Sequence, residues 1–332
     1  MDSHLILIVL VAVALTFDFL NGFHDSANIV ATMISSGAMA PRRALLIASL
    51  AEFSGPFLFG TAVAATIGES IVSPETITSG VILAALGSAI VWDLVTWYFG
   101  LPSSSSHALI GGLVGAAVMA ARGIATIHVD GLLKVIVALF VSPLLGIVGG
   151  YLFMKLVLFL ARGASPKVNI LFKNLQIPTS IALALSHGTN DAQKTMGIIT
   201  MALVMLGLAP SFEVPRWVVL LCAAAISLGI ATGGWRIIRT MGAGMYRIRP
   251  VHGFNIQLTS AAVILGAALL GGPVSTTQVV SSAIMGVGSA ERLSKVRWSV
   301  AGNILLAWLV TIPASIVMAA VFYLAIQRLF GP

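Results

Sequence analysis

The sequence predicts an all-α polytopic membrane protein built from two inverted-topology repeats, and three observations lead to this fold. Of the 332 residues, 58% are hydrophobic and only 9% are charged, whereas a soluble domain carries about 25% charged residues. The hydrophobic residues fall into ten blocks. One polar motif with an aspartate near its centre occurs twice, around residues 25 and 191.

The charge pattern and the cysteine content exclude several kinds of protein. The formal net charge is +7, but the basic residues lie in short segments between hydrophobic blocks, which is typical of cytoplasmic loops and not of nucleic-acid binding. The single cysteine, Cys222, excludes a disulfide framework or a cysteine metal cluster. The first hydrophobic block contains Asp18 and runs directly into the first motif, so we expect a membrane segment there and not a signal peptide.

Each half of the chain contains five hydrophobic segments. A spanning helix needs about 20 apolar residues, and we expect the first segment of each half to be broken by its motif. Broken helices or re-entrant hairpins of the two halves are expected to meet near the midplane. In order, the segments are 5–36, 44–67, 79–100, 104–121 and 131–161, then 175–209, 216–234, 253–271, 275–289 and 298–327. The predicted repeats are 1–165 and 166–332, each with about five crossings, and no separate soluble domain is expected.

The charged residues between the segments predict the orientation. Basic residues follow the first, fifth, seventh and ninth segments, whereas Glu69 and Glu75 follow the second. Placing the basic loops in the cytoplasm sends corresponding segments of the two halves across the membrane in opposite directions. The prediction is a multi-pass protein of the cytoplasmic membrane with both termini outside.

The repeated motif supplies the first set of candidate site residues. Its copies read Asn21-Gly22-Phe23-His24-Asp25-Ser26-Ala27-Asn28 and His187-Gly188-Thr189-Asn190-Asp191-Ala192-Gln193-Lys194. With the glycines aligned, the aspartates match each other, His24 matches Asn190 and Asn28 matches Lys194. A carboxylate inside an apolar segment is costly, so it marks a functional site.

Short runs of hydroxyl residues supply the second set. Pro102 and Pro273 each precede such a run at the start of a hydrophobic segment. Proline suits the first turn of a helix, and the unpaired N–H groups at that end favour an anion. Interrupted helices at matching places in two repeats are typical of secondary transporters. The candidate anion-binding residues are Ser104, Ser105, Ser106, Ser275, Thr276 and Thr277. The alternative interpretation is that they are ordinary N-caps.

The aspartates favour one oxyanion over another. Phosphate keeps one or two protons near neutral pH, and its P–OH groups need acceptors, whereas sulfate has no such donor. Asp25 and Asp191 are therefore predicted to contact phosphate as well as a coupling cation. The alternative for Asp191 is a structural ion pair with Lys194, three residues along the same helical face.

Other buried polar residues are weaker candidates. His24 is the best proton carrier, because imidazole titrates near physiological pH. His107 and His187 flank the motifs and are more typical of interior histidines than of proton relays. Helix packing explains Glu52 and Asp93 at least as well as transport does, and Asp18 fits an ion path or a helix end equally.

These motifs resemble the inorganic phosphate transporter (PiT) family, and most closely its bacterial and archaeal low-affinity branch. The resemblance rests on both copies of the repeated motif, on the stretch from Trp92 to Leu109 and on Pro273 to Thr277, and it covers about residues 15–310. It implies an inverted-repeat symporter that imports inorganic phosphate, usually as a dimer in the lipid bilayer. The hydroxyl runs would hold the phosphate, and Asp25, Asn28, Asn190 and Asp191 would serve the coupling cation and the phosphate.

Two departures from the family pattern bear on the coupling ion. Many sodium-coupled members have asparagine where His24 and Lys194 stand here. A lysine ammonium could occupy one cation position outright, so coupling to a proton is favoured over coupling to sodium bound at Asp25, Asn28, Asn190 and Asp191. The expected protein has no enzymatic activity, no cofactor and no nucleic-acid partner. The alternatives are a sulfate permease of the same family, transport of a metal–phosphate complex in place of free phosphate and, with the least support, an intramembrane serine hydrolase.

Overall fold

The computed structural model describes residues 3–330 and is built from helices. The first half contains α1 Ser3–Ser35, α2 Pro41–Leu58, α3 Ala62–Glu69, η1 Pro74–Thr76, α4 Ser79–Phe99, α5 Ser105–Ala121, η2 Ile124–Thr126 and α6 Val129–Leu160. The second half contains α7 Val168–Met205, α8 Arg216–Thr232, α9 Trp235–Arg239, the π-helix η3 Thr240–Gly244, α10 Pro250–Leu269, α11 Thr276–Glu291, η4 Leu293–Lys295 and α12 Trp298–Phe330. All ten predicted hydrophobic segments therefore contain helix.

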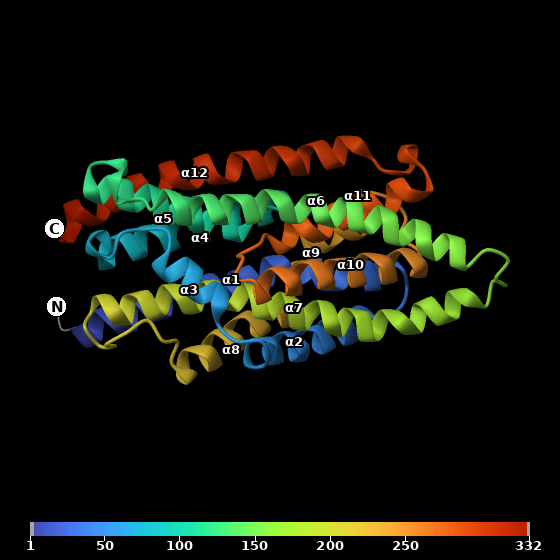
Figure 1. Ribbon diagram of the computed structural model, residues 1–332, viewed down its shortest axis with the longest axis horizontal. Coiled ribbons are helices and arrows are strands. Elements are labelled where there is room, and N and C mark those ends of the chain that lie inside the picture. Colours follow the sequence, from blue (N-terminus) through green and yellow to red (C-terminus); the bar gives the residue numbers. More distant parts are fainter. Residues whose placement is uncertain (1–2, 331–332) are drawn as a thin grey trace.

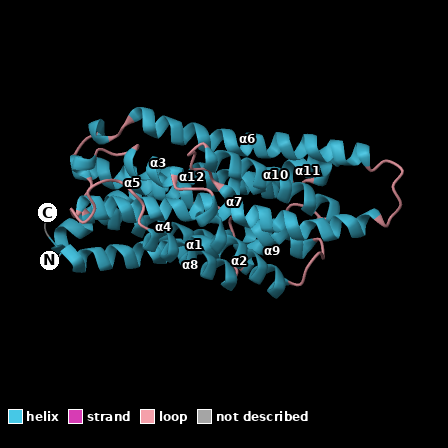
Figure 2. Cartoon of the chain, turned by 60° about the horizontal axis from the view of Figure 1, so that its bottom comes forward, coloured by secondary structure: helices cyan, strands magenta, loops and turns pink. Residues whose placement is uncertain are grey.

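The helices lie along one long axis (Figures 1 and 2). Both chain ends lie at the same end of the molecule, which we call the terminal end, and the loop between α6 and α7 lies at the opposite, far end (Figure 1). Helix α1 leaves the terminal end, whereas its counterpart α7 returns toward it. Corresponding helices of the two halves thus run in opposite directions.

The motif-containing helices are unbroken, which corrects the sequence-based expectation. Helix α1 has 33 residues and α7 has 38, and each continues through its copy of the motif. A helix satisfies its own backbone groups, so polar side chains in an apolar segment do not require a break when protein surrounds them. The motif side chains from Asn21 to Asn28 are almost all buried.

The breaks lie instead in the spans that pack on the motif helices. Helices α2 and α3 meet at 75°, and α8 meets the α9–η3 segment at 59°. Each bend contains a glycine with positive φ, Gly60 at 79° and Gly233 at 75°, a conformation that side chains with a Cβ atom rarely adopt.

Motif side chains satisfy the backbone groups that these breaks expose. Gln193 of α7 accepts hydrogen bonds from the backbone N–H of Val63 (2.9 Å) and Ala64 (3.3 Å), and it donates to the carbonyl of Gly60 (2.7 Å). Ser26 of α1 accepts from the N–H of Gly234 (2.7 Å). Each half of the chain therefore completes the broken span of the other half, which meets the requirement for paired backbone groups within a membrane.

Glycines allow the motif helices to approach these spans closely. A Cβ atom added to Gly22 would lie 2.1 Å from the carbonyl oxygen of Ile226 in α8. One added to Gly188 would lie 2.3 Å from the carbonyl oxygen of Glu52 in α2. Small residues at such contacts are typical of helix packing in membranes, and they explain why the motif contains a glycine in both copies.

The remaining short helices form two hairpins. The outer ends of α4 and α5 lie together, where Thr126 of η2 donates to Thr76 of η1 (2.6 Å). The outer ends of α10 and α11 are joined by hydrogen bonds from Arg249 and His252 to Glu291. The inner turns of the two hairpins meet in the middle of the molecule, where the Ser106 hydroxyl donates to the Val274 carbonyl (3.1 Å).

The number of crossings is smaller than the ten that the sequence predicted. Six helices are long and apolar enough to span a membrane, and the two bent pairs raise the number of candidate spans to at most eight. Two of these candidates, α4 and α10, are hairpin arms that turn back at the centre. Hydrophobicity does not distinguish an arm that turns back from one that crosses, so counting hydrophobic segments overestimated the crossings.

Candidate functional site

The two motif aspartates meet at the centre of the molecule. The hydroxyl of Thr276, in the first turn of α11, donates to Asp191 Oδ2 (2.9 Å) and lies 3.1 Å from Asp25 Oδ2. The two carboxylates therefore lie on either side of one hydroxyl, although 166 residues separate them in the chain. All three side chains are buried, with 3% exposure or less.

The next hydroxyl of α11 serves the first-half motif. Thr277 donates to Asp25 Oδ1 (2.7 Å), and Asn28 donates through Nδ2 to the Thr277 hydroxyl (3.1 Å). The Asn28 carbonyl oxygen, Oδ1, is buried without a hydrogen-bond partner among residues 3–330. Asp25, Thr277 and Asn28 thus gather oxygen atoms, and no lysine or arginine of the described chain pairs with Asp25.

Lys194, the counterpart of Asn28, has a different set of contacts. Its ammonium donates to Asp191 Oδ1, to the Ser106 hydroxyl and to the Val274 carbonyl at 2.9 Å. These oxygens come from α7, from the α4–α5 hairpin and from the α10–α11 hairpin. Lys194 is 2% exposed. The ion pair of Asp191 and Lys194 that the alternative interpretation expected is present. It is part of the central cluster, because Asp191 also contacts Thr276.

His24 and Asn190, which occupy matching positions, also differ in their contacts. His24 Nδ1 lies 3.1 Å from Asp25 Oδ1, and its Nε2 lies 3.4 Å from the hydroxyls of Thr96 and Ser103. Asn190 instead donates to the Gly272 carbonyl (3.1 Å) and accepts from the Val274 N–H (3.3 Å). His24 contacts the carboxylate, whereas Asn190 holds the turn of the second hairpin in place.

Some of the hydroxyl candidates contact the charged centre, and others cap helices. Ser106 contacts Lys194, and Ser105 donates away from the aspartate pair, to Asp93 (3.1 Å). Ser104 accepts from the His107 N–H (3.2 Å), and Ser275 accepts from the Gln278 N–H (3.3 Å). Ser104 and Ser275 are therefore N-caps of α5 and α11, as the alternative interpretation expected. Ser106, Thr276 and Thr277 are the hydroxyls that reach the charged centre.

Two residues that sequence reasoning ranked low belong to the same cluster. His187 Nε2 lies 3.3 Å from Asp191 Oδ2 and 3.7 Å from Asp25 Oδ2, and its Nδ1 lies 2.7 Å from Glu52 Oε1. The position of His187, four residues before Asp191 on one helical face, was a usable signal. Glu52 had no such signal, because only the packing of α2 against Gly188 brings it there.

The cluster offers ligands for a cation. One ligand atom each from Asp25, His187 and Asp191 lie within 4.8 Å of one another. Of the residues predicted for sodium, the two aspartates are in this group. Asn28 lies at its edge through Thr277, and Asn190 is engaged with the second hairpin. Carboxylate and hydroxyl oxygens suit a hard cation, and a carboxylate beside imidazole also suits a proton.

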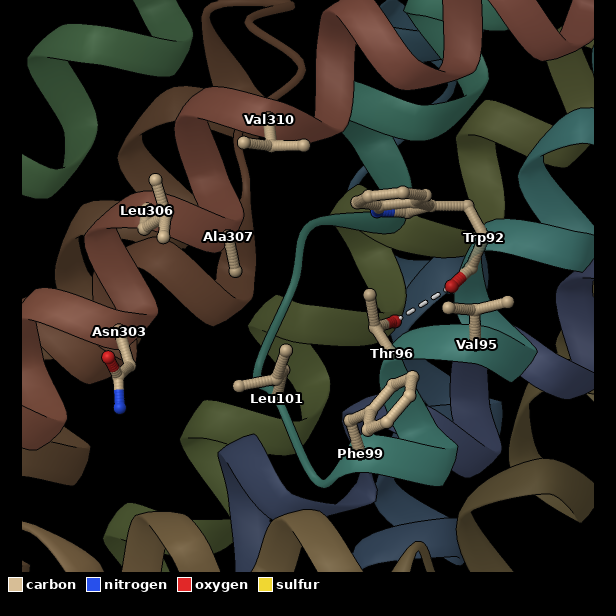
Figure 3. A pocket seen from close by; sticks show the side chains of 9 residues that line it. All are labelled: Trp92, Val95, Thr96, Phe99, Leu101, Asn303, Leu306, Ala307 and Val310. Atoms are coloured by element: carbon tan, nitrogen blue, oxygen red, sulfur yellow. Dashed lines mark hydrogen bonds between the residues drawn. The ribbon is translucent and has the colours of Figure 1, made fainter.

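Two apolar cavities flank the cluster. One, of about 280 Å³, lies between α4 and α12 and is lined by side chains that include Trp92, Phe99 and Leu306 (Figure 3). Thr96 borders it and separates it from His24, and the Thr96 hydroxyl donates to the Trp92 carbonyl (2.9 Å; Figure 3). The other, of about 470 Å³, is lined by α5, α6, α11 and α12. Their walls are mainly hydrocarbon, with a few polar side chains such as Thr96, His107 and Gln278.

Comparisons with known proteins identify the family. The phosphate transporter family matches the chain twice, over residues 21–165 and 160–319. A probable low-affinity inorganic phosphate transporter of Bacillus subtilis is 46% identical, over 99% of this chain and 100% of the relative. One of the same name from Rhizobium meliloti is 47% identical over 96% of each chain.

A solved structure of a sodium-dependent phosphate transporter is also similar. It matches with a TM-score of 0.89 and 26% sequence identity, over 98% of this chain and 100% of that chain. The fold described above is therefore shared with a protein of known structure. Together with the two family matches and the relatives above 40% identity, this likeness shows that the chain belongs to the phosphate transporter family.

Proposed function

We propose that this membrane transporter is a secondary symporter that imports inorganic phosphate across the cell membrane by alternating access, coupled to protons. The observation that carries the proposal is the central cluster, where two buried aspartates meet the hydroxyls at the tips of two hairpins. Membership of a transporter family supports transport over enzymatic activity. It also argues against the serine hydrolase alternative.

The chemistry of the cluster favours phosphate over sulfate. Hydroxyls of Thr276, Thr277 and Ser106 are donors for the oxygens of an anion, and the amino ends of α5 and α11 favour negative charge. Asp25 and Asp191 are acceptors for P–OH protons, which sulfate lacks. A carboxylate beside sulfate would only repel it, so sulfate gains nothing from either aspartate.

The arrangement of helices supports alternating access about this cluster. The two proposed inverted repeats, 1–165 and 166–332, run in opposite directions, and each sends one hairpin to the centre from its own end of the molecule. Binding sites of inverted-repeat transporters lie where such interrupted elements meet. Lys194 touches both hairpin tips, so movement of either tip changes the contacts of the charged centre.

Charge distribution supports the proposed orientation. The loops that follow α1, α6, α9 and α11 lie at the far end and carry basic residues. The end of α3 and η1, which contain Glu69 and Glu75, lie toward the terminal end (Figure 1). Basic loops stay in the cytoplasm. We therefore propose that the far end is cytoplasmic and that both termini are outside.

Lys194 is the reason to favour a proton over sodium. Its ammonium contacts three oxygens from three elements, among them a carboxylate and a backbone carbonyl, which are ligands that transporters use for sodium. We infer that this tethered cation takes the place of one mobile cation. The remaining carboxylate, Asp25, pairs with His24, a side chain suited to exchange protons near neutral pH.

Uptake of radiolabelled phosphate into proteoliposomes tests the proposal. One arm imposes a proton gradient without sodium, a second imposes a sodium gradient at equal pH, and a third adds excess unlabelled sulfate. We expect the proton gradient alone to drive uptake and sulfate to leave it unchanged. Uptake that requires sodium would refute the proposed coupling ion, and strong competition by sulfate would refute the proposed selectivity.

A further inference from the structure

Asp18 is a buried acid outside the central cluster. It lies on α1 with 0% exposure. Its Oδ1 accepts a hydrogen bond from the Thr195 hydroxyl (2.8 Å), whereas its Oδ2 has no hydrogen-bond partner within the described part of the chain. Seven residues separate Asp18 from Asp25, so Asp18 lies about 10 Å nearer the terminal end along the helix.

The surroundings of Asp18 provide no counter-charge. Its chain neighbour Phe17 belongs to a buried apolar cluster that also contains Leu10, Ala14 and Met196. The thiol of Cys222 on α8 faces the carboxyl group. The charged groups that act on it from a distance are Asp191 and Glu52, which are acidic, and Lys194, which is engaged by Asp191. No ion pair of Asp18 occurs among residues 3–330.

A carboxylate in such a place does not stay charged. Burial of an unpaired ion costs far more than burial of the neutral acid, so the group takes up a proton. Asn21, one helical turn along on the same face, has an Oδ1 atom that is likewise buried without a partner in the described chain. A protonated Asp18 gains a donor, Oδ2–H, and the unpartnered Asn21 Oδ1 one turn away is an acceptor.

We propose that Asp18 is a binding station for the coupling proton, on the terminal side of the phosphate site. This inference rests on the proposed proton symport. The proton forms an O–H bond at Asp18 Oδ2 on loading, and that bond breaks when the proton passes inward to the carboxylate and imidazole groups around Asp25. The spacing of Asp18, Asn21, Asp25 and Asn28, at three and four residues, places a polar stripe along one face of α1 between the two sites.

Two features favour a proton over a metal cation at this station. The side-chain groups identified around it in the described chain are the oxygens of Asn21 and Thr195 and the thiol of Cys222, which are a poor ligand set for a hard cation. The second half also lacks an acid at the matching position, which is Ala184. The second half therefore has no equivalent of this station, and the proton binds on the terminal side alone.

The Asp18→Asn variant tests this proposal, because the amide has the shape of the protonated acid but cannot release a proton. Two rates are measured in proteoliposomes for each protein, namely uptake driven by a proton gradient and exchange of labelled for unlabelled phosphate at equal pH. We expect the ratio of driven uptake to exchange to fall by about tenfold or more in Asp18→Asn. Asp18→Glu keeps a titratable acid and should restore much of the ratio, whereas Cys222→Ala should leave it close to that of the wild type.

An infrared measurement keeps the station and the transport proposal separable. The infrared difference spectrum of wild type minus Asp18→Asn at neutral pH should contain the carbonyl stretch of a protonated carboxylic acid, whatever ion drives transport. An unchanged ratio in Asp18→Asn would refute the role in coupling. If this band is missing from the difference spectrum, Asp18 holds no proton in the purified protein. That result would refute the proposed station even if a proton gradient were found to drive uptake.

Discussion

Replacement of Lys194 by asparagine should convert the transporter toward sodium dependence. Lys194 is the positional counterpart of Asn28, so Lys194→Asn gives both copies of the motif the same residue at this place. The ammonium now contacts Asp191, Ser106 and Val274. Removal of the ammonium leaves these three oxygens without a cation. They would still surround the place where the ammonium was, so a metal cation could bind there.

The expected size of the defect follows from the burial of the pair. Asp191 is 1% exposed, and removal of one partner from a buried ion pair costs about 3–5 kcal/mol. His187 and Thr276 still contact Asp191 Oδ2 and soften the loss, so we expect the lower end of this range. The same uncompensated charge on Asp191 opposes binding of the phosphate anion, and about 3 kcal/mol lost from that binding corresponds to about a 100-fold decrease in uptake without sodium, at 1.36 kcal/mol for each factor of ten.

The assay is phosphate uptake by Lys194→Asn proteoliposomes with and without sodium, beside Lys194→Met and wild type. Sodium should restore uptake in Lys194→Asn to within about tenfold of wild type, because the amide oxygen replaces one missing ligand. Lys194→Met removes the charge without adding an oxygen, so sodium should rescue it much less. Wild-type uptake should not respond to sodium.

Equal responses of the two variants to sodium would refute this reasoning, since only the asparagine rebuilds a ligand set. A second readout applies if both variants are inactive. Sodium should raise the thermal unfolding midpoint of detergent-purified Lys194→Asn and not that of Lys194→Met. If sodium stabilises neither variant, the lysine does not stand in for a mobile cation.

Three further predictions concern the carboxylate, the packing and the second hairpin. Asp25→Asn should abolish proton-driven uptake while the protein stays folded, and the uptake assay with size-exclusion chromatography checks both. Gly188→Ala should destabilise the protein by about 1–3 kcal/mol, since the added methyl would meet the Glu52 carbonyl at 2.3 Å, whereas Gly302→Ala, with open space around it, should be neutral in thermal unfolding. Partial burial tends to raise the pKa of Glu291, but hydrogen bonds from His252 and Lys295 outweigh it and lower this pKa to about 2. Its stabilising contacts should therefore be fully present above about pH 4.5 and lost as the pH falls through 2, and Glu291→Gln should speed hydrogen exchange at residues 291–297 already at neutral pH.

Sequence patterns were sufficient to predict the helices but not which of them turn back at the centre of the molecule. All ten hydrophobic segments contain helix, and the repeat of the motif indicated two related halves. The segment 104–121 and the segment 275–289 looked like crossings because their residues are as apolar as those of a span. Their turns meet at the centre through Ser106 and Val274, a contact between segments 168 residues apart that no local pattern contains.

Members of the central cluster were predictable where one chain segment carried the whole signal. Asp25 and Asp191 could be recognised because each is an acid in an apolar helix. Glu52 could not be assigned, since its role depends on His187 and on the close approach that Gly188 permits. Ser104 and Ser106 looked equivalent in sequence, yet the first caps α5 and the second faces Lys194. Which hydroxyl of a helix start faces outward depends on the rotation of the helix, and the neighbouring helices determine that rotation.

Each copy of the repeated motif places an aspartate of the central cluster within two residues of a side chain that holds a bent span. Asp25 faces the central cluster, and the next residue, Ser26, holds the break between α8 and α9. Asp191 faces the same cluster, and Gln193, two residues on, holds the break between α2 and α3. Each aspartate therefore lies on a helix whose neighbouring side chain is hydrogen-bonded to the bend of a span in the opposite half. If the centre binds phosphate as proposed, this linkage gives that binding a direct physical route to the bent spans.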